Sequence, residues 1–107
     1  YAGQVFDYLG ITGATRGKCE FAKDVRQVLS YVEAGEVDAG IVYATDAAQS
    51  TKARVVAKAP AGSHEPIVYP AAVVSSSERF EAARDFVNWL AGPDAREVLA
   101  RRGFAIR

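Results

Sequence analysis

The chain has 107 residues, which suits one small domain or part of a larger two-lobed one. Its thirteen basic and thirteen acidic side chains cancel. A chain without a charge imbalance has no long-range field to attract nucleic acid or anionic lipid, so we expect no nucleic-acid partner. The single cysteine, Cys19, excludes an internal disulfide and a multi-cysteine zinc site.

The first part of the chain alternates helical and extended patterns. We predict a helix over residues 1–9, ended by Gly10, and then a loop rich in threonine and glycine. Asp24 stands where a helix N-cap belongs, and the apolar residues that follow have helical spacing until Gly35. A brief helix is expected at 46–49. The apolar or β-branched runs predict strands at 18–22, 38–44 and 54–59.

The second part opens with a turn-rich connection at 60–66. Residues 67–75 are extended and apolar but contain Pro70, which cannot donate to a ladder, so they predict an edge strand or a crossover between lobes. Two amphipathic helices follow, and Gly92-Pro93 closes the first and opens the second. Their inward residues are expected to be Ala83, Phe86, Val87, Leu90, Ala95, Val98 and Leu99. Helices interleaved with short strands predict an α/β fold.

Catalysis has little support in the sequence. His64 lies in a turn between Ser63 and Glu65, and adjacent turn residues point in divergent directions, so we interpret it as part of a polar surface turn. Cys19 is better explained as a small, semi-buried apolar residue than as a nucleophile. The carboxylates of Glu81 and Asp85 fall on a solvated helix face. We therefore do not expect an enzyme.

Two positions have the chemistry of an anion site. The N–H groups of the helix that begins at Val25 have no partner inside the helix, and the helix dipole adds partial positive charge there. The alternative is that Asp24 simply caps this helix. Tyr43 ends the apolar run 40–42, where the carboxyl end of a strand would open onto a ligand crevice. The alternative is a buried tyrosine whose hydroxyl is bonded to backbone.

Several stretches, in one order over essentially the whole chain, resemble the periplasmic molybdate-binding receptors of bacterial ABC transporters. They include 24–29 (DVRQVL), 38–47 (DAGIVYATDA), the pair Ser63-His64 followed by Tyr69-Pro70, and the closing helices to Phe104. The two central segments are fairly specific in combination, whereas the terminal helix pattern is shared more widely among binding proteins.

The resemblance implies a type II periplasmic-binding-protein-like fold, in which crossover strands join two α/β lobes and the anion lies between them. Residues 1–66 would be the remainder of the second lobe, 67–72 the crossover strand, and 73–107 a helical segment that normally packs on the first lobe. The fold would then be incomplete. Its exposed apolar helices lead us to expect a self-associated or domain-swapped assembly.

The resemblance also implies a site and a function. The backbone N–H of Val25 and the hydroxyl of Tyr43 would donate to the oxygens of molybdate or tungstate, without direct contact to the metal and without a cofactor. The other donors of the family come from earlier sequence, so the site would be incomplete. The partner would be the membrane permease of an ABC importer, and the location periplasmic, or extracytoplasmic and membrane-anchored. The alternative is an oxyanion-sensing effector domain of a transcriptional regulator.

Overall fold

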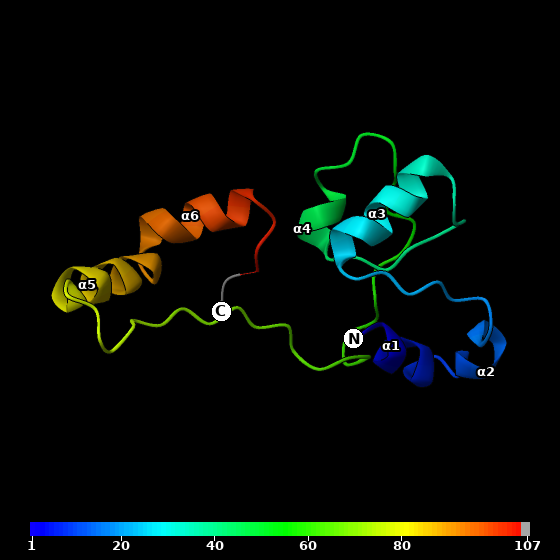
Figure 1. The fold of residues 1–107 in the computed structure, drawn as a ribbon, viewed down its shortest axis with the longest axis horizontal. Coiled ribbons are helices and arrows are strands. Elements are labelled where there is room, and N and C mark those ends of the chain that lie inside the picture. Colours follow the sequence, from blue (N-terminus) through cyan, green and yellow to red (C-terminus); the bar gives the residue numbers. More distant parts are fainter. Residues whose placement is uncertain (106–107) are drawn as a thin grey trace. The chain divides into compact units, whose positions relative to one another are not determined.

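The computed structural model describes residues 1–105 and divides the chain into two units, Tyr1–Ile67 and Val68–Arg107. Figure 1 shows helices joined by long extended segments. In chain order the helices are α1 (Ala2–Tyr8), α2 (Thr12–Thr15), α3 (Val25–Ala34), α4 (Ala44–Ala47), α5 (Phe80–Leu90) and α6 (Pro93–Arg101). The short helix α2 lies in the region predicted to be a loop, and α4 begins two residues before the brief helix that the sequence indicates.

The ends of α3 confirm the prediction from its capping residues. The Asp24 carboxylate accepts the N–H of Gln27 at 2.9 Å, as an N-cap does. The Gln27 side chain reaches back and accepts the N–H of Lys23 at 2.8 Å. Gly35 ends the helix with a φ of 74°, a left-handed conformation that glycine adopts without steric cost. Local sequence chemistry is therefore enough to set both boundaries of α3.

The strand predictions are wrong for this structure. Within residues 1–105 no strand is assigned, and the segments 18–22, 38–43, 54–59 and 67–75 are extended or irregular without ladder partners. The apolar composition of such a run favours burial, but a strand also needs a neighbouring strand to satisfy its N–H and C=O groups. The sheet of the expected α/β fold is therefore not confirmed in the described residues.

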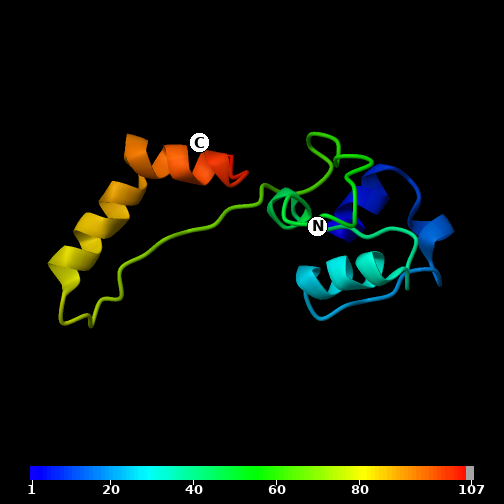
Figure 2. The ribbon, with the colours of Figure 1, turned by 90° about the horizontal axis from the view of Figure 1, so that it is seen from above.

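The segment before α4 packs against a helix instead of a strand. Gly40 lies so close to α3 that a Cβ atom added there would be 2.6 Å from Val28 Cγ1 and 2.9 Å from Val32 Cγ2. Contacts between α3 and α4 continue the same packing, and the ribbon shows the two helices as neighbours (Figures 1 and 2). The absence of a side chain at position 40 thus lets the segment before α4 approach α3 closely.

The second unit consists of an extended stretch followed by α5 and α6, which contact each other across Gly92. Ala95 is buried, as predicted for the inner face of α6. The Tyr69 ring meets Phe104 edge to face, with ring centroids 5.7 Å apart. Two residues predicted to face inward do not: Phe86 is 58% exposed and Val98 is 49% exposed. Phe86 instead stacks on Trp89 of the same helix, with ring centroids 5.8 Å apart.

The apolar surface is incompletely covered in both units. Among the described residues, Val5 and Ala95 are the buried hydrophobic side chains, and Phe21, Val56 and Val74 are largely exposed. No helix in residues 1–105 has the length and apolar character needed to cross a membrane.

Candidate functional site

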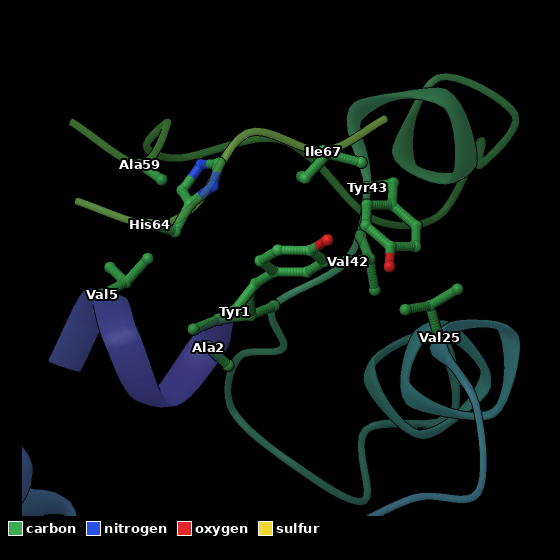
Figure 3. Close-up of a pocket in the computed structure, with 10 residues that line it drawn as sticks. Tyr1, Ala2, Val5, Val25, Val42, Tyr43, Ala59, His64 and Ile67 are labelled. Atoms are coloured by element: carbon green, nitrogen blue, oxygen red, sulfur yellow. The ribbon is translucent and has the colours of Figure 1, made fainter. Parts of the chain in front are cut away.

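The first unit contains an open hollow of about 230 Å³, bordered by four separate pieces of the chain. These pieces are the beginning of α1, the beginning of α3, the segment before α4, and residues 59–67 (Figure 3). The lining residues are Tyr1, Ala2, Val5, Val25, Ile41, Val42, Tyr43, Ala59, His64 and Ile67. Most of them are aliphatic, and none of the ten carries a carboxylate. The polar side chains among them are those of two tyrosines and one histidine, Tyr1, Tyr43 and His64.

Val25 lines this hollow as the first residue of α3. Its side chain is half-buried. The Asp24 carboxylate accepts the N–H of Gln27, which is the third residue of the helix. The N–H of Val25 stands at the first position, where no acceptor exists within the helix. Capping by Asp24 and a donor at Val25 are thus compatible, although the sequence presents them as alternatives.

Tyr43 lines the same hollow from the N-cap position of α4. Its backbone is extended, with φ −72° and ψ 151°, and its side chain is half-buried. Figure 3 shows its hydroxyl directed toward the side of the hollow where Val25 lies. The structure therefore brings both candidate residues to one concavity. Tyr43 follows an unpaired extended segment, however, and not the strand that the sequence predicts.

His64 contributes to the hollow, which its interpretation as part of a polar surface turn did not predict. The residue is half-buried and its ring lines the hollow (Figure 3). The ring meets Tyr1 edge to face, with centroids 5.7 Å apart. A signal for this position was present, because the Ser63-His64 pair belongs to the stretches that resemble the receptor family. Reasoning from the turn alone missed it, since a turn sequence does not reveal what packs against it.

The residues weighed for catalysis lie apart from the hollow or have structural partners. Ser63 is buried, and its hydroxyl donates to the carbonyl of Pro60 at 2.7 Å. Cys19 is half-buried, with its sulfur 3.4 Å from the carbonyl oxygen of Thr15, in line with its interpretation as a small packed residue. Glu81 pairs with Arg84 on an exposed face of α5. Within residues 1–105, no group of three or more His, Cys, Asp or Glu residues could hold a metal ion.

A helix start and a phenol that meet in a largely aliphatic hollow suit the binding of a small anion. The chain belongs to the bacterial extracellular solute-binding protein family, whose sequence pattern matches residues 1–105. This membership confirms the resemblance to solute-binding receptors that the sequence motifs indicate.

Three relatives from different bacteria are similar along nearly the whole chain. YvgL of Bacillus subtilis (strain 168), named as a substrate-binding lipoprotein of an ABC transporter, is 41% identical over 97% of this chain and 40% of its own length. The molybdate-binding protein ModA of Escherichia coli (strain K12) is 38% identical over 100% of this chain and 41% of its own. ModA of Haemophilus influenzae (strain ATCC 51907 / DSM 11121 / KW20 / Rd) is 36% identical, with coverages of 100% and 42%. The chain thus spans about two fifths of the length of these curated relatives.

Proposed function

We propose that this chain contributes to an extracytoplasmic receptor that binds molybdate or tungstate and delivers it to the membrane permease of an ABC importer. The observation that carries the proposal is the common position of Val25 and Tyr43 in one hollow. Two relatives named as molybdate-binding proteins support the choice of ligand. The ABC transporter name of a third relative favours an import receptor over the effector domain of a regulator.

The chemistry of the ligand matches a site built from donors. Molybdate at neutral pH is a fully deprotonated tetrahedral dianion, so its oxygens accept hydrogen bonds and offer none. The N–H of Val25 and the hydroxyl of Tyr43 are both donors, and the dipole of α3 adds partial positive charge beside Val25. None of the ten described residues that line the hollow has a side-chain carboxylate that would repel the anion. Aligned dipoles can stabilise an oxyanion without an arginine or lysine.

The same chemistry separates molybdate from other oxyanions. Phosphate is still partly protonated at neutral pH, and its proton would face a donor, which is an unfavourable contact. Sulfate is fully deprotonated but smaller, so it would not reach all donors at once. Tungstate has the charge and nearly the size of molybdate, and we expect the site to accept both. No cofactor takes part, because binding uses only the oxygens of the anion.

The wider architecture that we propose has two lobes. Residues 1–66 would belong to the second lobe, 67–72 would cross between lobes, and 73–107 would pack on the first lobe with their apolar helix faces. Exposure of Phe86 and Val98 is in keeping with faces that normally have a partner surface. Closure of the lobes about the crossover would bury the anion and create the form that the permease recognises.

Calorimetric titration of the complete protein with sodium molybdate, tungstate, sulfate and phosphate tests this proposal. Molybdate and tungstate should bind with similar affinity, and sulfate and phosphate at least tenfold more weakly. Absence of heat with all four anions, or preference for phosphate, would contradict the proposal.

A further inference from the structure

One wall of the hollow is formed where the start of the chain contacts the turn at residues 60–65. The Tyr1 and His64 rings meet edge to face, with centroids 5.7 Å apart and an interplanar angle of 69°. The side-chain oxygen of Gln4 accepts the N–H of Glu65 at 2.9 Å across 61 positions of sequence. Both contacts tie α1 to the turn that ends at residue 65. Ring centroids at this separation lie within the favourable range for an aromatic pair.

Hydrogen bonds orient the His64 ring and close the turn that carries it. Its Nδ1 lies 2.7 Å from the carbonyl oxygen of Glu65, a hydrogen bond that the ring makes as a donor. Two hydrogen bonds from Ser63 to the carbonyl oxygen of Pro60 close the turn that carries the ring. The backbone N–H of Ser63 donates at 3.1 Å and its hydroxyl at 2.7 Å. Ser63 itself is 3% exposed. These hydrogen bonds stabilise the turn and the ring orientation in which His64 meets Tyr1.

Tyr1 stands across the hollow from the candidate ligand residue Tyr43. Figure 3 shows the Tyr1 hydroxyl directed toward Tyr43, and both residues line the same space. The helix that carries this wall, α1, has seven residues, and a helix of that length is not stable in isolation. Its position must come from contacts with the rest of the unit. The ring of His64 and the burial of Val5 supply such contacts.

From this geometry we propose that His64 is a positioning residue of the anion site: its ring holds Tyr1, and through Tyr1 it sets the wall opposite Tyr43. The inference rests on the proposed function, because it assigns a role within the same hollow. It places no ligand on His64 itself. Loss of the ring would let the start of α1 move and the hollow widen. Anion binding would then weaken, although the donor residues Val25 and Tyr43 are themselves unchanged.

A double-mutant cycle on the complete protein tests the inference, with molybdate affinity measured by calorimetry. His64→Ala and Tyr1→Leu should each weaken binding about 3- to 10-fold, the range expected for loss of one aromatic pair. The double variant should be no weaker than the worse single variant, because both changes break the same contact. His64→Phe, which keeps a ring for the contact with Tyr1 but loses the Nδ1 hydrogen bond to Glu65, should retain more affinity than His64→Ala. Tyr8→Leu, at the other end of α1 and outside the hollow, is the matched control and should bind normally.

The outcomes separate this inference from the proposed function. If the unmodified protein binds neither molybdate nor tungstate, the proposed function fails and the inference fails with it. If the unmodified protein binds and His64→Ala binds equally well, the inference alone is wrong. Additive losses in the cycle would also overturn it. His64→Asn guards against simple unfolding: it offers a polar side chain to the turn without the ring, and normal affinity in this folded variant would reject the role of the ring.

Discussion

Gly40 and Val28 approach so closely that a methyl group on Gly40 would lie 2.6 Å from Val28 Cγ1. This contact presses the segment that leads to Tyr43 against the helix that begins at Val25. The two candidate donors therefore share one hollow because a glycine allows their supporting segments to pack side by side.

Gly40→Ala is expected to lower the free energy of unfolding by about 1–3 kcal/mol, the usual cost of overpacking a tight contact. The added methyl would meet Val28 and Val32, so the segment must shift away from α3. Denaturant unfolding of the complete protein measures the change. Gly13→Ala is the matched control, since a Cβ there meets nothing within 4 Å, and it should not destabilise the protein. Equal stability of the Gly40→Ala variant would show that the contact is not tight.

Tyr43→Phe removes one phenolic donor from the hollow and keeps the ring. We expect molybdate affinity to fall about 10-fold or more, since a hydrogen bond to a charged group is worth about 1.5–3 kcal/mol. Titration calorimetry on the complete protein checks the value. Tyr8→Phe changes an exposed tyrosine outside the hollow and should bind as the unmodified protein does. Unchanged affinity of Tyr43→Phe would remove Tyr43 from the site.

Asp24→Ala should destabilise the protein by about 1 kcal/mol, because the N–H of Gln27 loses the carboxylate that accepts it at 2.9 Å. Asp24→Asn should cost less than half of that, since asparagine is an equally good N-cap. Urea unfolding of the three proteins compares them. A loss of the same size in both variants would mean that the charge of Asp24, and not its capping bond, stabilises α3.

The 107-residue chain produced by itself should self-associate, as the sequence interpretation expects. Phe86 and Trp89 on α5 are exposed apolar side chains that a second copy of the chain could cover. Light scattering over a range of concentrations measures the mass. Phe86→Glu, on the exposed face of α5, should reduce the association. A monomeric mass for the unmodified chain at all concentrations would refute this prediction.

Short-range chemistry explains where the prediction from sequence succeeded. The helix α3 begins after Asp24 and ends at Gly35 because a side-chain cap and a left-handed glycine act on residues within one turn. Pro93 likewise opens α6, where its missing N–H costs nothing. Val25 could be named for the same reason, because it is the first residue of α3. Tyr43 was named from the end of a predicted strand that the structure does not contain.

The contacts that failed to be predicted are those between distant segments. Four apolar runs have the composition of strands, but a strand exists only when a second one pairs with it, and no pairing partner is visible in a local pattern. The polar turn around His64 does not reveal the contact of its ring with Tyr1, which lies far away in sequence. Both ends of α3 and the start of α6 were thus determined by the sequence itself, through interactions within a few residues. The common hollow and the wall held by His64 were decided by the tertiary structure, because their contacts join residues that only folding brings together.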